Sequence, residues 1–281
     1  MEHEPRDFEA LIAHLEELTE EYDEDHTPEF LSQLTHDAPE VRAVAVRGLW
    51  ESDPMEVLEP LWRVAEHDVD PEVRATALSV MGRYIYEGLL LGDREDPFTE
   101  SPLDPETIDR VRGFLEKILF DEQQDVLMRR RALEALAFDP GPEDVALIER
   151  WAQDSSSGLR MTAVFAMGRA GLDNFEPLIL QALDDSAYEV RREAVRGIGE
   201  AGIEKGLPRL ELLIQGSDRE MQLEAISALG LVGGDRAIEL LSELVESEDA
   251  EIAELAEAAL EAAEEVSYEE GFLENLDDEN V

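Results

Sequence analysis

The residues in this sequence best suited to acid–base or metal chemistry are its five histidines, His3, His14, His26, His36 and His67. Only His36 and His67 occupy equivalent positions, since each is followed by an aspartate and each precedes a predicted helix. Two such His-Asp pairs in neighbouring segments could hold a metal ion between them. The simpler interpretation is that each aspartate caps the helix that follows it, because its carboxylate accepts from free backbone N–H groups. We therefore expect no metal site.

No other arrangement of residues predicts catalysis. The sequence has no cysteine, which excludes disulfides and thiolate metal sites. It contains no Gly-x-x-x-x-Gly-Lys phosphate loop, no Gly-x-Ser-x-Gly nucleophile turn and no Gly-x-Gly-x-x-Gly stretch after a strand. Pairs of carboxylates are so frequent that none of them stands out. We expect no catalytic residue and no cofactor, and hence a protein that is not an enzyme.

The charge of the chain restricts its partners. Seventy acidic residues outnumber 23 basic ones, which gives a formal net charge of −47, and only Lys117 and Lys205 are lysines. Such a surface repels phosphate backbones and anionic lipids, so we expect neither nucleic acid nor a membrane as partner. Three explanations stay open: a solvated surface that favours solubility, adaptation to a salt-rich cytoplasm, or attraction of a basic protein. The longest apolar run, residues 88–92, is too short to cross a bilayer, and we expect a cytoplasmic protein.

The elements that position these residues repeat along the chain. Segments such as residues 189–199 and 220–230 align position for position, and each contains one apolar anchor residue. The anchors are Val41, Val73, Met128, Leu159, Val190, Met221 and Ile252. From Met128 onward they lie 31 residues apart, the first step is 32, and the step from Val73 to Met128 is 55. The period predicts a repeat protein with an insertion at residues 84–105.

Each repeat is predicted to contain two helices. In the fifth, Val190, Ala194 and Ile198 share one face of a helix, and a second helix follows at residues 207–214. No run alternates between apolar and polar residues as a strand does. Because neither helix of a pair can bury its apolar face alone, the repeats must stack. We predict an all-α, right-handed α-solenoid of about seven two-helix repeats with a 31-residue period.

We divide the chain into three parts. Residues 1–26 are predicted to form a capping helix and an acidic link, residues 27–263 the solenoid, and residues 264–281 an acidic C-terminal tail that frays. Apolar residues of the tail, among them Tyr268, could form a short binding motif or fold back on the last repeat. The insertion could shape a binding face or be a tolerated surface loop.

The spacing around the anchors resembles the HEAT repeat, in which an aspartate precedes the anchor by five positions and an arginine follows it. The phrase Glu-Val-Arg-x-x-Ala is most similar to the phycobilisome-lyase subclass of HEAT-like repeats, and the resemblance covers about residues 27–263. It implies an armadillo/HEAT-like superhelix in which aspartates and arginines of successive repeats form a ladder. The matching residues are Asp68, Arg74, Asp154, Arg160, Asp185 and Arg191. Gln222 and Ala253 replace the arginine in the last two repeats, so we expect the ladder to end near the fifth repeat.

The activities known in this family are not supported by the residues here. The HEAT-like iron hydroxylase uses several His-Glu pairs spread over its repeats, whereas His3-Glu4 is the only such pair in this sequence. Members of the lyase subclass attach or detach a tetrapyrrole, but no motif here matches that chemistry. The resemblance is specific for architecture and says little about function.

The resemblance also implies which surface binds a partner. In HEAT-type solenoids the second helix of each repeat, which carries the Val-Arg phrase, lines the concave face. Side chains two and six positions after the anchor should point away from the packed face. From these positions we predict a binding surface made of Arg47, Arg130, Met161, Phe165, Arg192, Arg196 and Leu223. The alternative is that Met161 and Phe165 are buried between repeats.

These observations favour a non-catalytic protein-binding scaffold or adaptor that uses its concave face. The expected partner is a protein, basic or presenting an extended peptide, and the chain itself is expected to be a monomer. The alternative function is an accessory subunit of an enzyme, such as a phycobilin lyase-like complex that handles a chromophore.

Overall fold

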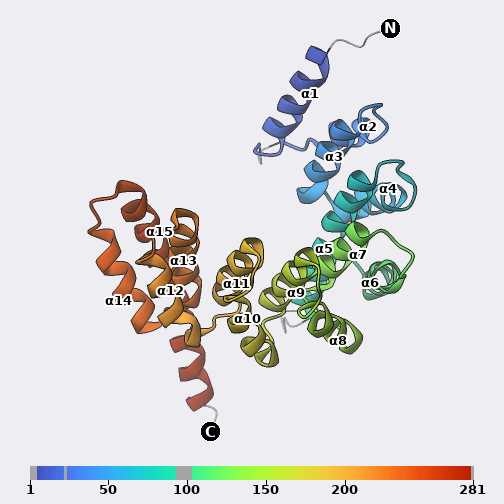
Figure 1. Cartoon of the computed structure of the whole chain (residues 1–281). Helices are drawn as coiled ribbons and strands as arrows, with labels where there is room; N and C mark the ends of the chain where they lie inside the picture. The colour runs from blue at the N-terminus through green and yellow to red at the C-terminus, as the bar shows by residue number, and fades with distance from the viewer. Residues whose placement is uncertain (1–4, 22–23, 93–102, 280–281) are drawn as a thin grey trace. The chain divides into compact units, whose positions relative to one another are not determined.

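Helices account for all regular structure in the described part of the chain. The computed structural model describes residues 5–21, 24–92 and 103–279, and within these ranges there are fifteen α-helices, three short 3-10 helices and no strand (Figure 1). The prediction of an all-α fold is confirmed.

The helices belong to two compact units, Met1–Gly141 and Pro142–Val281. In the first unit, α1 (Pro5–Leu18) precedes three pairs: α2 (Thr27–Gln33) with α3 (Pro39–Gly48), α4 (Pro54–His67) with α5 (Pro71–Gly92), and α6 (Pro105–Phe120) with α7 (Val126–Leu136). The second unit contains four pairs: α8 (Pro142–Trp151) with α9 (Ser157–Ala170), α10 (Glu176–Ala182) with α11 (Tyr188–Glu200), α12 (Leu207–Ile214) with α13 (Arg219–Val232), and α14 (Gly234–Val245) with α15 (Ala250–Glu279). The 3-10 helices are η1 (Leu49–Glu51), η2 (Asp173–Phe175) and η3 (Glu204–Gly206). These seven pairs match the seven predicted repeats.

The second helices of neighbouring repeats cross backbone to backbone at a recurring glycine. A Cβ atom added at Gly168 would lie 2.9 Å from the Cα of Gly197, and one at Gly230 would lie 3.0 Å from the Cα of Ala259. The same contact recurs where Gly82 meets Ala135 and where Gly199 meets Ala228. Each of these glycines lies nine residues after its anchor, and its partner lies seven residues after the next anchor. The small residues are therefore required by the close approach of the helices.

Arginines after the anchors join the repeats through the loops that precede the second helices. Arg160 forms an ion pair of 2.7 Å with Asp185 in the next repeat, and Arg42 forms one of 2.7 Å with Asp68. Arg74 and Arg191 instead donate within their own repeats, to the backbone oxygens of Asp68 and Asp185, at 2.7 and 2.8 Å. These are contacts within each unit.

Asp154 departs from the expected ladder, and Gln222 lies where the ladder was expected to end. Asp154 caps its own loop instead, since its side chain accepts from the backbone N of Ser156 at 2.8 Å. In the sixth repeat Gln222 takes the place of the arginine and donates to the backbone oxygens of Ile214 and Gly216, at 2.9 and 2.7 Å. A neutral amide thus reproduces the contacts to the loop without the ion pair.

The aspartates that follow His36 and His67 do not cap the next helices, so that prediction was wrong. The residue that precedes α3 is Ala38, and its backbone N donates to Nδ1 of His36 at 3.1 Å. Asp68 is held by Arg42, and Asp70 accepts from the backbone N of Glu72 at 2.9 Å at the start of α5. Asp68 is thus used between repeats, which leaves the capping of α5 to Asp70.

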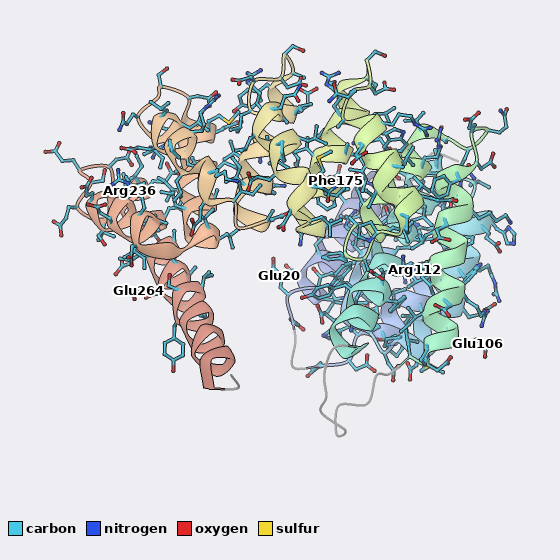
Figure 2. All side chains as sticks on the ribbon, turned by 90° about the horizontal axis from the view of Figure 1, so that it is seen from below. Glu20, Glu106, Arg112, Phe175, Arg236 and Glu264 are labelled. Atoms are coloured by element: carbon cyan, nitrogen blue, oxygen red, sulfur yellow. The ribbon has the colours of Figure 1, made fainter. Side chains whose placement is uncertain are left out.

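One predicted boundary, the start of the C-terminal tail, does not coincide with a helix end. Helix α15 runs unbroken from Ala250 to Glu279, past the predicted start of the tail at residue 264, and Glu264 lies on this helix (Figure 2). Helix α5 continues to Gly92, which covers the first part of the insertion. Most of the loop predicted at residues 92–105 lies outside the described residues.

Among the described helices, none is both long and apolar enough to span a bilayer.

Candidate functional site

The predicted binding residues all lie on second helices, but in two separate units. Arg47 on α3 and Arg130 on α7 belong to the first unit. The second unit holds the other five, which are Met161 and Phe165 on α9, Arg192 and Arg196 on α11, and Leu223 on α13. Because α9, α11 and α13 pack in succession, these five lie on three adjacent helices. We call this set the α9–α13 surface.

Phe165 is neither fully exposed nor part of the core. Both Phe165 and Met161 are half-buried, between the two alternatives considered for them. The guanidinium carbon of Arg169, one turn further along α9, lies 5.4 Å from the centre of the Phe165 ring. That distance permits a cation–π contact. The charged side chain of Arg169 therefore lies over one face of the aromatic ring.

Arg192 and Arg196 share one carboxylate on the next repeat. Arg192 Nε donates to Glu224 Oε2 at 2.9 Å, and Arg196 Nε donates to Glu224 Oε1 at 3.2 Å. The two arginine side chains stay 45% and 38% exposed, whereas that of Glu224 is 16% exposed. The hydrogen bond to Glu224 raises the pKa of the Arg192 guanidinium. Glu224 therefore fixes the two arginines side by side and leaves part of each facing solvent.

Glu200 lies between the arginines of two helices. Its Oε1 forms an ion pair of 3.2 Å with Arg169, while its Oε2 is buried and has no hydrogen-bond partner among the described residues. Burial raises the pKa of the Glu200 carboxyl, and the positive charges of Arg169 and Arg196 act in the opposite direction. The α9–α13 surface is thus a network of arginines and partly buried glutamates beside a half-exposed aromatic ring.

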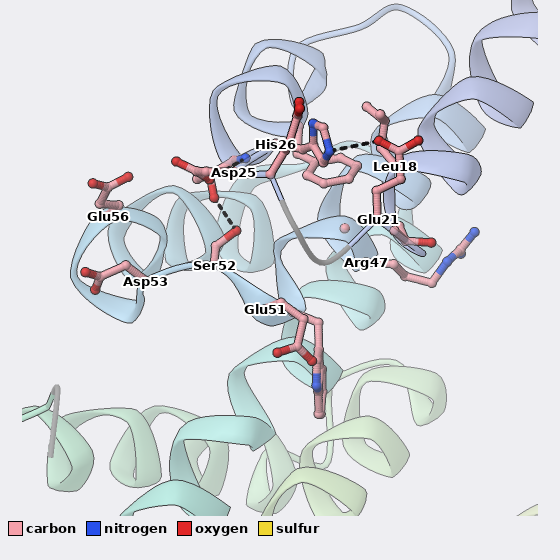
Figure 3. A pocket seen from close by; sticks show the side chains of 15 residues that line it. Leu18, Glu21, Asp25, His26, Arg47, Glu51, Ser52, Asp53 and Glu56 are labelled. Atoms are coloured by element: carbon pink, nitrogen blue, oxygen red, sulfur yellow. Dashed lines mark hydrogen bonds and ion pairs between the residues drawn. The ribbon is translucent and has the colours of Figure 1, made fainter. Parts of the chain in front are cut away.

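In the first unit, Arg47 lies beside two pockets. The larger, of about 830 Å³, lies between the end of α1, the start of α2 and the loop from α3 to α4. Figure 3 shows Asp53 and Glu56 on the side of this pocket away from Arg47. Arg47 is largely exposed and lies 4.0 Å from Glu16. The second pocket, of about 550 Å³, is lined by residues of α3, η1, α5 and α7.

Basic residues on the first helices, or just before them, also pair with acids of the preceding repeat. In the second unit, Arg236 on α14 lies 3.2 Å from Glu211 on α12 (Figure 2). Arg209 lies 2.7 Å from Asp184, and Lys205 lies 2.7 Å from Glu176. In the second unit, most basic residues therefore form contacts between repeats. With 70 acids against 23 bases, most acids of the chain have no basic residue to pair with.

Sequence reasoning missed Arg169, Glu200 and Glu224. A pattern in the aligned repeats could have identified Glu224, because it lies three residues after its anchor and faces arginines two and six residues after the preceding anchor. Arg169 and Glu200 each lie ten residues after an anchor, which makes them equivalent positions of adjacent repeats.

The described residues contain no group of three or more His, Asp or Glu side chains that could hold a metal ion.

Comparison with known proteins identifies the repeats. Residues 27–94 and 175–261, together more than half of the chain, match the family model of HEAT repeats. The solved structure of YibA from E. coli is 15% identical, with 93% of this chain and 98% of that chain covered and a TM-score of 0.50. The complex of CpcE and CpcF of phycocyanin lyase from a Nostoc species is 17% identical, with 86% and 97% covered and a TM-score of 0.51. Identities this low show a shared fold. A comparison with curated proteins finds no match.

Proposed function

This chain belongs to the HEAT-repeat family, and we propose that it is a non-catalytic protein-binding scaffold or adaptor. The surface that binds its partner is formed by the second helices of the repeats. The observation that carries this proposal is the α9–α13 surface. Half-exposed Phe165 lies on α9, and the adjacent helix α11 carries two arginines that Glu224 holds in place.

Aromatic and arginine side chains are enriched where proteins bind one another, because each buries a large area and arginine adds directed hydrogen bonds. Phe165, Arg192 and Arg196 all keep exposed area in the folded unit. Folding therefore does not use the whole contact area of these side chains. What remains is available to a protein partner.

The charge of the chain indicates the chemistry of that partner. A net charge of −47 attracts a basic protein, or an extended peptide with basic residues, and repels nucleic acid and anionic membranes. We propose that the chain acts in the cytoplasm, as a monomer, without a cofactor.

Capture of partners from the native organism, quantified with purified variants, tests this function. Phe165→Ala removes the aromatic ring, and we expect it to lower capture of the partner at least about tenfold, as truncation at the centre of an interface does. Leu212→Ala is the matched control, because Leu212 is an apolar residue of the same unit that is 63% exposed on the first helix α12. Capture that is unchanged by Phe165→Ala but lowered by Leu212→Ala would contradict the proposed surface.

Arg192→Gln tests the polar part of the surface. Glutamine removes the charge without placing a second carboxylate beside Glu224, which lies 2.9 Å from Arg192. We expect weaker capture and nearly unchanged stability, since an exposed ion pair contributes about 0–1 kcal/mol.

The alternative function is an accessory subunit of an enzyme. It is favoured by the likeness of fold to the complex of two subunits of a phycocyanin lyase. The absorbance spectrum of protein purified from its native organism distinguishes the two functions. A visible band from a bound chromophore would favour the accessory subunit, and a spectrum of aromatic residues alone would favour the scaffold.

A further inference from the structure

Trp50 is a large apolar side chain that the packing of the repeats does not bury. It is 43% exposed, and it lies nine residues after the anchor Val41. At the equivalent position the second, fourth, fifth and sixth repeats have the glycines that allow second helices to touch. At the position nine residues after the anchor, the first repeat therefore has a tryptophan, the largest side chain, whereas these four other repeats have a glycine, which has none.

The first repeat accommodates this side chain by ending its helix early. Helix α3 ends at Gly48, and Trp50 lies in the 3-10 turn η1. The residue seven positions after the next anchor is Val80, whereas the crossings described above have alanine or glycine there. Trp50 and Val80 line the pocket of about 550 Å³ between these helices. Two bulky residues thus occupy positions where the other repeats have small ones, and a pocket lies beside them.

Trp50 also lines the larger pocket, so that space is available on both sides of this residue. The acidic residues that line the two pockets are Glu21, Glu24, Asp25, Glu51, Asp53, Glu56 and Glu72. The arginines among the lining residues are Arg47 and Arg131, and Arg131 is paired with Glu134. The larger pocket has six of these acids against Arg47, whereas the smaller pocket has Glu72 against Arg47 and Arg131. A cation is therefore favoured on the side of the indole that faces the larger pocket.

Hydroxyl groups in the smaller pocket add acceptors. Thr76 Oγ1 donates to the backbone oxygen of Glu72 at 2.7 Å, and Ser79 Oγ donates to that of Ala75 at 3.3 Å. Because each hydroxyl proton is used within α5, each oxygen is left as an acceptor. The smaller pocket thus has acceptors for an N–H donor, but its own lining already includes Arg47 and Arg131.

We propose that Trp50 is the platform of a binding site for a cationic side chain, arginine or lysine, carried by a protein partner. The cation lies over the face of the indole on the side of the larger pocket, and carboxylates of that pocket, among them Glu51 and Asp53, compensate its charge. This inference rests on the proposed scaffold function and assigns to the first unit a recognition site separate from the α9–α13 surface.

Titration of the full chain with a defined peptide tests the site. The probe is an acetylated and amidated Arg-Gly-Arg-Gly-Arg peptide, and Glu-Gly-Glu-Gly-Glu is its anionic counterpart, both measured by calorimetry at 0.15 M salt. We expect the basic peptide alone to bind, Trp50→Ala to weaken it about fivefold or more, and Trp50→Phe to weaken it less, because phenylalanine keeps an aromatic face. Equal affinity for the wild type and Trp50→Ala would overturn the proposal.

A pair of charge variants distinguishes a site from diffuse attraction to an acidic protein. Glu51→Gln with Asp53→Asn removes two charges beside Trp50, and Glu243→Gln with Glu246→Gln removes two exposed charges from the second unit. We expect only the first pair to weaken binding more than twofold. Equal losses for both pairs would mean that the peptide senses net charge alone. Peptide affinity reports on the Trp50 site and partner capture by Phe165 variants reports on the scaffold, so either proposal can fail without the other.

Discussion

Arg160 donates two hydrogen bonds to Asp185 of the next repeat, from Nε to Oδ2 at 2.7 Å and from Nη2 to Oδ1 at 2.8 Å. The two side chains are only 14% and 15% exposed. The hydrogen bonds from Arg160 lower the pKa of the Asp185 carboxyl, and burial acts in the opposite direction. This pair fastens α9 to the loop before α11, so its protonation state is linked to the stability of the second unit.

Asp185→Asn should destabilise the protein by about 1–3 kcal/mol at pH 7, the range for a hydrogen-bonded charged group. Because the pKa of Asp185 is lower in the folded than in the unfolded chain, the stabilisation is complete above about pH 4–5 and is lost as the pH falls through the folded-state pKa. Urea unfolding at several pH values should therefore show a wild-type advantage that shrinks in acid. Asp184→Asn is the control, because Asp184 pairs with Arg209 but is 70% exposed, and it should cost less than about 1 kcal/mol.

Gly168→Ala should destabilise the protein by about 1–3 kcal/mol, since the new methyl group would lie 2.9 Å from the Cα of Gly197 and neither backbone can move freely. Gly113→Ala, in the interior of α6, meets no atom within 4 Å and should stabilise the protein by roughly 0.5–1 kcal/mol. Thermal unfolding of the two variants tests the helix crossing. A stabilising Gly168→Ala would show that the helices are farther apart.

Phe165→Ala should cost about 1–2 kcal/mol, because only part of the ring is removed from solvent. Phe175→Ala, in the same unit, should cost about 3–5 kcal/mol, because Phe175 has no exposed surface. Chemical denaturation of both variants compares the two rings directly. Equal losses would identify Phe165 as a core residue and remove the anchor of the α9–α13 surface.

The melting temperature of the full chain should rise as NaCl increases from about 0.01 to 0.5 M, because the screening length falls from about 30 Å to a few ångströms and acids repel one another less. Salt also weakens the ion pairs between repeats, but each exposed pair contributes only about 0–1 kcal/mol. With 70 acids against 23 bases, repulsion is the larger effect. KCl should act like NaCl. A melting temperature that does not change with salt would show that the repulsion is already neutralised.

The sequence predicted the helix pairs well because their determinants are local. The anchor Val190 and the residues at helical spacing after it define α11, and the 31-residue period places the same helix in other repeats. The position of the predicted binding residues on second helices followed from the same alignment. Helix ends were less predictable, as α15 shows, because an acidic segment with helix-forming glutamates can extend a helix that packing has already started.

The sequence by itself determined the period, the helical class and the excess of negative charge, because these depend on residue types and on spacing within one repeat. Only the tertiary structure decided which acids hold the arginines and which apolar residues stay exposed. Arg196 and Glu224 are separated by 28 residues and meet because α11 and α13 cross, and the exposure of Trp50 depends on where α3 ends relative to α5. Such contacts depend on the distance between packed helices, which no single repeat specifies.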